Sequence, residues 1–498
     1  MSATATAAPY RMFIDGRWTE AESGDRFESD DPFRGEAWTT IPRGSAADVD
    51  RAVRAAHVAF TSGDWRRLTP SRRGALLRTL GDLAARHSAS LAETETRDNG
   101  KLLSEMRMHT AYAPQWYHYY GGLADKVEGA VVPTDKAHTF NYTRYEPLGV
   151  VAAIVPWNSP LLLTAWKLAP ALAAGNTVVL KPSEYASASV LEFVALVEEA
   201  GFPPGVVNVV TGFGHEVGVP LVEHPLVAKV AFTGSDVTGQ RIYEAAARGL
   251  KRVSLELGGK SPNIVFDDAN LDNAVKGVVS GIFAATGQTC IAGSRLLVQE
   301  SIHDRFVEKL IALAKTARMG NPMEPDTQIG PVINRLQLDR ILGYMDVARA
   351  EGARAVLGGH RAAGPECGSG WFVEPTIFDG VDNRMRIAQE EVFGPVLAVI
   401  SFKDDEEAVA IGNEVVYGLA AGVWTENIRR ALTMAERLQA GTVWINTYRA
   451  VSYLSPFGGY KRSGIGRESG PEAIKEYLQV KSVWISTATD VPNPFIQR

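Results

Sequence analysis

The sequence has few cysteines and no long apolar run. Only two cysteines, Cys290 and Cys367, occur in 498 residues, which is too few for a disulfide framework and suits a reducing cytosol. No apolar run approaches the roughly 18 residues that a membrane helix needs. Residues 1–9 lack the charged and apolar parts of a signal peptide, so we interpret them as a disordered tail. We therefore expect a cytoplasmic protein that does not bind membranes.

The sequence also lacks an excess of positive charge. The formal net charge is −6, which gives no electrostatic reason to bind nucleic acid. Hydrophobic residues make up 45% of the chain and charged residues 22%, the balance of an ordinary globular protein. At roughly 100–200 residues per domain, the length indicates two to four domains.

Short β-branched runs alternate with helical segments in the first half of the chain. Residues 44–128 are predicted to be helical, and further helices are expected near 160–173, 186–200, 214–223 and 236–248. The predicted strands lie at 150–155, 177–180, 206–210, 229–232 and 253–255. Continuous Val-rich runs are typical of strands buried on both faces, so the fold class is α/β with a doubly wound parallel sheet.

A second alternating set extends from about 271 to 446 and predicts a second α/β domain. Its expected strands are 295–298, 396–402, 422–425 and 442–445. Two polar, alternating strands, 138–146 and 480–486, fall outside both sheets. Such strands are candidates for edge pairing with another subunit.

Cys290 lies in Thr286-Gly-Gln-Thr-Cys290, just past a helix predicted to end near residue 285. Gly287 breaks that helix, so that a loop presents the thiol. A free thiol with a pKa of ~8.5 is only slightly ionised at neutral pH, yet it is a strong nucleophile. By itself, a lone cysteine is more often a buried structural residue.

Two further residues could complete a site around a nucleophile. Glu256 ends an apolar strand before Gly258-Gly259, where parallel sheets place functional groups, and an apolar setting would raise its pKa toward that of a general base. Alternatively, it is a surface carboxylate. Asn158 lies in the first strand-to-helix turn, where its amide could donate a hydrogen bond to an oxyanion or could simply cap a helix.

From about residue 13 to residue 482, the chain resembles the aldehyde dehydrogenase superfamily, in its hydrolytic, non-acylating branch. Seven motifs occur in the order of that family: Pro-Trp-Asn, Lys-Pro-Ser-Glu, Phe-Thr-Gly-Ser, Leu-Glu-Leu-Gly-Gly-Lys, Gly-Gln-Thr-Cys, Glu-Glu-Val-Phe-Gly-Pro and Pro-Phe-Gly-Gly-Tyr-Lys. Any one of them could arise by chance, but seven in order could not.

The resemblance implies a mechanism. Cys290 attacks the aldehyde carbon, and the Asn158 amide with the Cys290 backbone N–H holds the oxyanion. Loss of hydride to the nicotinamide gives a thioester, which a water activated by Glu256 hydrolyses to the acid. Lys167 and Glu468 match the family positions that relay the proton outward.

The resemblance also implies a cofactor, NAD, with NADP possible. Ser235 opens a predicted helix whose N-terminus suits a pyrophosphate. Lys181 and Glu184 match contacts to the adenosine ribose, where Glu184 would repel a 2′-phosphate that Lys181 would attract. Glu391 and Phe393 match contacts to the nicotinamide ribose and ring. The other residues placed along the cofactor are Val155, Pro156, Trp157, Ser183, Gly214, Phe232, Thr233, Gly234, Gly239 and Leu257.

Two patterns are set aside. The Gly-rich segment 212–218 imitates a dinucleotide fingerprint but follows the third strand of the sheet, so we assign it only a lesser role beside the adenine. His118, His215 and His303 lack the spacing of metal ligands, so no catalytic metal is expected.

The implied substrate tunnel has an apolar, aromatic wall. Its residues are Tyr112, Trp116, Leu162, Trp166, Ile291, Tyr453 and Phe457. This wall suits an aromatic or medium-chain aldehyde better than a small charged one. Ser159 stands where many relatives carry an aromatic residue, which opens the pocket or weakens a cage for quaternary ammonium groups. Arg449 could pair with an anionic substrate, but a solvated loop arginine is the favoured interpretation.

The resemblance divides the chain into three parts: a cofactor-binding domain (1–128 and 149–257), a catalytic domain (258–450) and a small β oligomerisation element (129–148 and 470–498). Residues 451–469 return to the active site. A dimer or tetramer is implied.

One alternative function is that of a CoA-acylating semialdehyde dehydrogenase, against which Glu256 argues. Another is a catalytically silent binding protein, against which the joint presence of Cys290, Glu256 and Asn158 argues.

Overall fold

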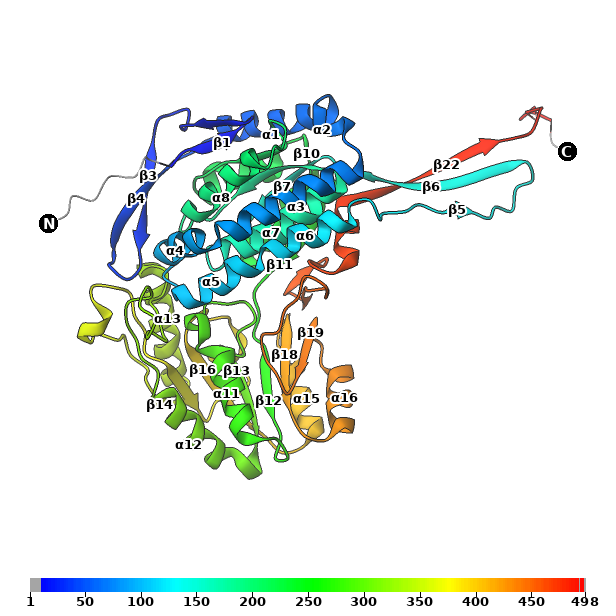
Figure 1. Ribbon diagram of the computed structural model, residues 1–498. Coiled ribbons are helices and arrows are strands. Elements are labelled where there is room, and N and C mark those ends of the chain that lie inside the picture. The colour runs from blue at the N-terminus through cyan, green and yellow to red at the C-terminus, as the bar shows by residue number, and fades with distance from the viewer. Residues whose placement is uncertain (1–9, 492, 497–498) are drawn as a thin grey trace.

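The computed structural model, which describes residues 10–491 and 493–496, shows two α/β lobes and a projecting β arm (Figure 1). The first lobe is built on an eight-stranded sheet and the second on a seven-stranded sheet. The tail predicted for residues 1–9 lies outside the described residues. No helix in the described part of the chain is long and apolar enough to cross a membrane.

Five parallel strands form the centre of the first sheet, which confirms the doubly wound prediction. In spatial order they are β9 (Val207–Val209), β8 (Thr177–Lys181), β7 (Val150–Ile154), β10 (Val227–Thr233) and β11 (Arg252–Glu256). Successive residues of β7 point into different cores, with Val151 and Ala153 in one and Val150 and Ala152 in the other. The sheet is therefore covered by helices on both faces.

The helices of the first lobe follow the predicted ranges closely. They are α1 (Ala46–Thr61), α2 (Asp64–Arg67), α3 (Pro70–Arg86), α4 (Ser88–Asn99), α5 (Leu103–Tyr112), α6 (Pro114–Leu123), α7 (Pro160–Ala174), α8 (Ala188–Glu199), α9 (Val219–Glu223) and α10 (Asp236–Arg248). Only the helix expected at 214–223 differs, since Gly214–Gly218 form a π-helical turn before α9. Pro220 in the first turn of α9 lacks the N–H that would continue a regular helix backward.

The sequence did not predict the edges of the first sheet. β1 (Met12–Ile14) and β2 (Arg17–Thr19) extend it antiparallel on one side, and β21 (Gly464–Ile465) does so on the other. A separate hairpin pairs β3 (Arg26–Asp31) with β4 (Glu36–Pro42). The three edge strands have only two or three residues each, too few for a recognisable hydrophobic alternation.

The second sheet confirms the second α/β set. Its order is β14 (Arg354–Leu357), β15 (Thr376–Asp379), β16 (Val396–Phe402), β13 (Arg295–Gln299), β12 (Pro262–Val265), β18 (Ala420–Trp424) and β19 (Thr442–Ile445), all parallel except β14. Its helices are α11 (Leu271–Ile282), α12 (His303–Ala314), α13 (Arg335–Ala350), α14 (Arg386–Gln389), α15 (Asp405–Asn413) and α16 (Ile428–Arg437).

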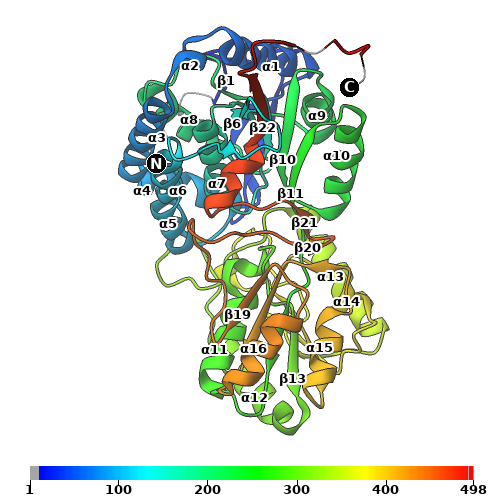
Figure 2. The same ribbon diagram turned by 90° about the vertical axis from the view of Figure 1, so that its right-hand side faces the viewer.

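A small antiparallel pair, β17 (Tyr417–Gly418) and β20 (Tyr460–Lys461), links the segment before β21 to the second lobe. Figure 2 shows β20 and β21 between the two lobes. The segment that contains β20 and β21 therefore joins the first sheet through β21 and pairs with β17 through β20.

The arm contains the two polar strands that were expected outside both sheets. β6 (Thr139–Pro147) pairs antiparallel with β22 (Leu478–Ser486) along its whole length, and β5 (Val131–Val132) flanks β6. The buried Asn141 amide donates to Ser482 Oγ and to the Val483 carbonyl, both at 3.0 Å. β22 is the outer strand of this sheet and exposes Val480 and Trp484.

The packing of α11 on β18 generates a stability prediction. A Cβ at Gly277 would overlap the Trp424 ring, which a 2.8 Å hydrogen bond to Asn263 holds in place. We expect Gly277→Ala to lower the free energy of unfolding by about 1–3 kcal/mol through overpacking. Gly343→Ala, on the exposed face of α13 with no atom near its Cβ, should raise it by about 0.5–1 kcal/mol. Urea unfolding measures both, and equal effects would contradict the packing argument.

Candidate functional site

Two hollows meet at Cys290, between the lobes. One, of about 620 Å³, has on its wall residues that follow β7, β10 and β11, together with Glu391 and Phe393 of the second lobe. The other, of about 680 Å³, extends toward α7. Asn158, Thr233, Glu256 and Cys290 line both hollows. A molecule in each hollow would therefore meet the same four side chains.

The loop before Cys290 is held in an unusual backbone conformation. α11 ends at Ile282, three residues before the predicted end, and Ala285, Thr286 and Gly287 follow with φ of 55°, 52° and 67°. For the two non-glycine residues such a conformation costs on the order of 1–3 kcal/mol each. The Ala285 N–H donates to Glu105 at 2.7 Å, and the Thr286 hydroxyl donates to the Gly330 carbonyl at 3.2 Å.

The Cys290 thiol is neutral in this setting. Burial, followed by the nearby carboxyl groups of Glu391 and Glu256, raises the pKa of Cys290 to about 12. The thiol therefore needs a base before it can attack a carbonyl carbon. The other cysteine, Cys367, is buried in a separate small core of the second lobe.

Glu256 is a buried carboxyl group without a hydrogen-bond partner among the described residues. Burial and then the charge of Glu468 raise the pKa of Glu256 well above its ordinary value, although Lys167 acts in the opposite direction. Its position is fixed by its neighbours, because the Gly234 N–H donates to the Glu256 carbonyl at 3.0 Å and the Leu257 N–H donates to the Ser463 carbonyl at 2.9 Å. A buried carboxyl group held in this way is a candidate general base for a molecule in either hollow.

Lys167 and Glu468 form a buried ion pair beside Glu256. The ammonium of Lys167, from α7, bonds Glu468 and also donates to Thr233 Oγ1 at 2.7 Å. The second carboxylate oxygen of Glu468 has no hydrogen-bond partner among the described residues, and the side chain lines the second hollow. The structure thus brings together the two predicted relay residues, which are 301 positions apart.

Asn158 faces the cysteine loop and does not cap α7, whose first residue is Pro160 and whose cap position is Ser159. Its side-chain amide donates to the Gln288 carbonyl at 3.2 Å. An amide has two N–H donors, so one stays available toward a molecule at Cys290. The alternative of a helix cap is therefore excluded for Asn158.

The first hollow contains many of the predicted cofactor residues. Ser235 caps α10, since its hydroxyl accepts from the Thr238 N–H at 3.3 Å. The rings of Trp157 and Phe393 are 5.2 Å apart, edge to face. The predicted residues on its wall are Pro156, Trp157, Thr233, Gly234, Ser235, Leu257, Glu391 and Phe393. The sequence did not predict Gln337 and Arg340, which also line it.

Glu391 lies against the chain segment that joins the two sheets. One carboxylate oxygen accepts from the Gly259 N–H at 3.0 Å, and a Cβ at Gly258 would overlap the same side chain. Burial raises the pKa of Glu391 to about 7. A side chain at 258 would thus displace this carboxyl group.

Other predicted cofactor residues lie outside the lining of the two hollows. Lys181 is buried and forms a 2.9 Å ion pair with Glu184, so its charge is already matched. Gly239 packs closely against Leu257, where a Cβ would overlap that side chain. The remaining residues of this kind are Val155, Ser183, Gly214 and Phe232.

The predicted tunnel residues divide into a wall and its support. Leu162, Trp166, Ile291 and Phe457 line the second hollow. Tyr112, Trp116 and Tyr453 are not in this lining. They support the wall from behind, since Trp116 stacks on Trp166 at 5.5 Å and contacts the other two rings edge-on or tilted.

Three basic side chains also line the second hollow. Lys101 and His109 carried no signal in the sequence, because their place depends on how α4 and α5 pack against α7. Arg449, which was expected to be a solvated loop residue, lies in a loop and is half-buried, and it also lines the second hollow.

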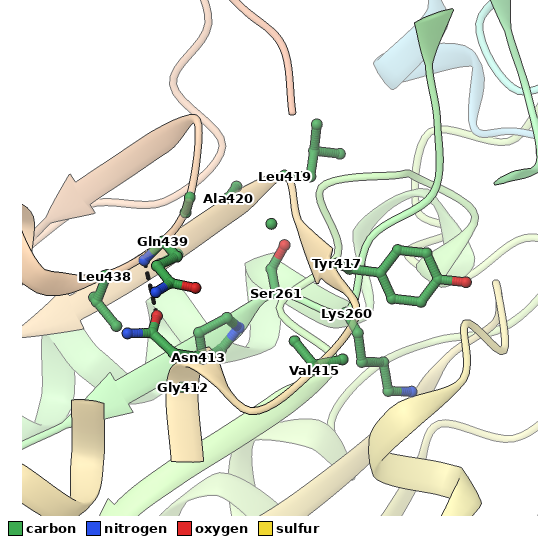
Figure 3. Close-up of a pocket in the computed structure, with 14 residues that line it drawn as sticks. Lys260, Ser261, Gly412, Asn413, Val415, Tyr417, Leu419, Ala420, Leu438 and Gln439 are labelled. Carbon is green, nitrogen blue, oxygen red and sulfur yellow. Dashed lines mark hydrogen bonds between the residues drawn. The ribbon is translucent and has the colours of Figure 1, made fainter. Parts of the chain in front are cut away.

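A third cavity, of about 240 Å³, lies in the second lobe near β17 and β18 (Figure 3). Lys260 contributes to its wall, but the ammonium is directed away from Asn413 and Gln439. The side-chain oxygen of Asn413 already accepts a hydrogen bond from the Gln439 backbone N–H at 2.8 Å. This cavity contains neither the thiol nor its carboxyl partners, so the chemistry belongs to the other two.

The three histidines that were not expected to bind a metal each lie beside a carboxylate. The partners are Asp82 for His118, Glu216 for His215, and both Asp304 and Asp379 for His303. Across residues 10–491 and 493–496, no group of three or more His, Cys, Asp or Glu side chains could hold a metal ion.

Comparisons with known proteins agree with this architecture. Residues 18–483 match the model of the Aldehyde dehydrogenase family. The chain is 47% identical over 476 residues to an aldehyde dehydrogenase of Emericella nidulans, covering 95% of each protein. It is 46% identical over 492 residues to the (Z)-2-((N-methylformamido)methylene)-5-hydroxybutyrolactone dehydrogenase of Acinetobacter baylyi, covering 98% of this chain and 99% of that protein.

A solved structure is also similar along nearly the whole chain. The betaine aldehyde dehydrogenase of Staphylococcus aureus in complex with NAD+ superimposes with a TM-score of 0.97 at 42% identity, covering 98% of this chain and 97% of that one. This likeness supports the arrangement of both lobes and the arm.

The protonation state of Cys290 can be tested without any substrate. Because its pKa is raised to about 12, we expect the rate of iodoacetamide alkylation at Cys290 to rise about tenfold per pH unit from pH 7 to pH 10, in proportion to thiolate. Mass spectrometry measures the labelling, and Cys290→Ser gives the contribution of Cys367. A plateau below pH 9 would show that the thiol is already ionised.

Proposed function

The chain is an enzyme of the aldehyde dehydrogenase family, and on that premise we propose that it oxidises an aldehyde to the carboxylic acid with NAD through a covalent intermediate on Cys290. One observation carries the proposal. Asn158, Thr233, Glu256 and Cys290 line two hollows at once, so an aldehyde in one and a cofactor in the other would both reach the thiol.

The residues of the first hollow fit a dinucleotide. The N-terminus of α10, a helix of 13 residues capped by Ser235, offers backbone N–H groups and a positive dipole to a pyrophosphate. Gly234 and Gly258 keep the backbone accessible, and the Trp157 and Phe393 rings give flat apolar surfaces. When bound, NAD+ supplies the hydride acceptor.

We assign four steps to the residues at the thiol. Cys290 gives up its proton to solvent water, and its sulfur bonds to the aldehyde carbon. The Asn158 amide and the Cys290 N–H stabilise the oxyanion of the thiohemiacetal. Loss of hydride from that carbon leaves a thioester. Glu256 then takes a proton from a water that attacks the thioester, which releases the acid and regenerates the thiol.

The Lys167–Glu468 pair is proposed to carry protons away from Glu256. A carboxyl group with a raised pKa is a good base but must return to its ionised form after each turnover. Glu468 has a free oxygen on the wall of the second hollow, and its partner Lys167 also bonds Thr233. This arrangement offers an acceptor close to Glu256 and shielded from bulk water.

Residues at the two proposed binding sites favour one cofactor and one class of aldehyde over others. Glu184 neutralises Lys181, which favours NAD over NADP, because a 2′-phosphate would meet a charge-matched pair. Trp166, Phe457 and Leu162 favour an aldehyde with an aromatic or medium-chain body. Ser159 leaves room where a bulkier residue would narrow the hollow.

We also propose which parts of the chain bind the cofactor, carry out catalysis and form the contacts between subunits. We assign cofactor binding to 1–128 and 149–257, catalysis to 258–450, and oligomerisation to 129–148 and 470–498. The exposed outer strand β22, with Val480 and Trp484, supports pairing with a second copy in a dimer or tetramer. The two free cysteines support a place in the reducing cytoplasm.

The reaction class is tested by NADH formation from an aldehyde, with and without CoA. We expect NADH and free acid without CoA at a rate that CoA does not raise, because Glu256 supplies hydrolysis. Cys290→Ser should abolish NADH formation while leaving NAD binding intact. Dependence on CoA would instead identify an acylating enzyme, and NAD binding without turnover would identify a silent one.

Glu256→Gln separates the two halves of the reaction. The amide cannot accept a proton, so hydrolysis should slow about 10²–10⁴-fold. Hydride transfer precedes that step, so rapid mixing should show a burst of about one NADH per active site. Glu308→Gln, an exposed change on α12, serves as the matched control and should behave as the native enzyme. Loss of NAD binding in Glu256→Gln would contradict the assigned role.

A further inference from the structure

We propose that the aldehyde carries a carboxylate, and that Lys101 and Arg449 bind this group inside the second hollow. The inference rests on the proposed function, since it concerns the substrate of the same site. It refines the aromatic or medium-chain aldehyde to one whose far end is negatively charged, the chemical class of the semialdehydes and formyl acids.

Lys101 is a buried ammonium with little to neutralise it. It is 2% exposed, and its Nζ makes one hydrogen bond, of 3.4 Å, to the neutral hydroxyl of Ser159. The carboxyl groups whose charge favours the ammonium form of Lys101 are Glu105 on α5 and Glu95 on α4. Neither lies within ion-pair distance, as judged over the described residues. A buried charge without a partner is costly, so this position is suited to a ligand that brings the opposite charge.

Arg449 supplies a second positive charge to the same hollow. Its backbone is in the left-handed region, with φ of 65°, and its guanidinium donates to the Ser280 carbonyl at 3.3 Å. That leaves most of its five N–H donors available. No carboxylate of the described chain pairs with it. A guanidinium can bind a carboxylate through two parallel hydrogen bonds, which gives direction as well as charge.

His109 adds a neutral polar group beside the two cations. Burial, then Lys101 and Arg449, lowers the pKa of His109 to about 3, so the ring is uncharged at neutral pH. Its Nδ1 is buried and has no hydrogen-bond partner among the described residues. The ring could therefore exchange a hydrogen bond with a carboxylate oxygen.

The carboxyl groups of the hollow do not cancel this charge. Glu468 is paired with Lys167, so Glu256 is the one carboxyl group left to face both Lys101 and Arg449 among the described residues that line the hollow. The second hollow is therefore net positive. A cation such as betaine aldehyde, whose dehydrogenase in Staphylococcus aureus has a similar fold, would be repelled by Lys101 and Arg449.

Matched aldehydes that differ only in the charged group test the inference. The pairs are 4-carboxybenzaldehyde with methyl 4-formylbenzoate, and succinic semialdehyde with butanal, compared by kcat/KM with NAD. We expect the carboxylate member to be preferred by about 10- to 100-fold, mostly through a lower KM, as for a charge-assisted hydrogen bond. The preference should shrink as salt is raised.

Substitutions then assign the preference to the two side chains. Arg449→Gln and Lys101→Gln should each lower the ratio of kcat/KM between the paired aldehydes by about tenfold or more, while Arg449→Lys keeps part of it. Arg429→Gln, at an exposed site on α16, is the matched control and should leave the ratio unchanged. Because Arg449 lies in a loop, its variant tests the inference even where Lys101→Gln fails to fold.

The outcomes separate this inference from the proposed function. Oxidation of neutral aldehydes at equal or higher kcat/KM than their carboxylates, or a preference for betaine aldehyde, would overturn the inference and leave the proposed function standing. An unchanged ratio in Arg449→Gln would also overturn it. If no aldehyde yields NADH, the proposed function itself is wrong.

Discussion

The five-residue link between the two sheets, residues 257–261, is the constraint on which the site depends. β11 ends at Glu256 and β12 begins at Pro262, so the lobes cannot separate far at this point. The link is bonded on several sides, because the Ser463 hydroxyl donates to the Gly258 carbonyl at 2.7 Å and the Gly259 N–H donates to Glu391. A Cβ at Gly259 would lie 2.7 Å from the Cys290 carbonyl oxygen. Glu256 and Cys290 are thereby held close by the backbone itself.

Exclusion of water is the second constraint that acts on several residues of the site at once. It raises the pKa of Cys290, Glu256 and Glu391 together, since a charged form loses its hydration in each case. The same exclusion makes it costly to remove either partner of the Lys167–Glu468 pair and to leave the charge of Lys101 unmatched. One physical condition thus governs both the proposed chemistry and the proposed choice of substrate.

Local patterns explain why much of the fold could be predicted. The five parallel strands of the first sheet and four strands of the second lie where the Val-rich runs indicated. Cys290, Glu256 and Asn158 could be chosen because they lie in sequence motifs of the family that occur together in the expected order. The nonlocal parts were missed: β1, β2 and β21 are too short to show a pattern, and Lys101 meets Ser159 across 58 residues only through helix packing.

The long-range pairings also set an order of assembly during synthesis. Lys167 and Glu468 are 301 residues apart, and β6 must pair with β22 across a similar distance. At about 5–20 residues per second, the ribosome makes the carboxylate some 15–60 s after the ammonium that it will neutralise. Until then α7 cannot bury Lys167 without a large electrostatic cost. The Cys290 thiol is therefore made well before the site around it can close, so that a partly synthesised chain has the thiol without its finished surroundings.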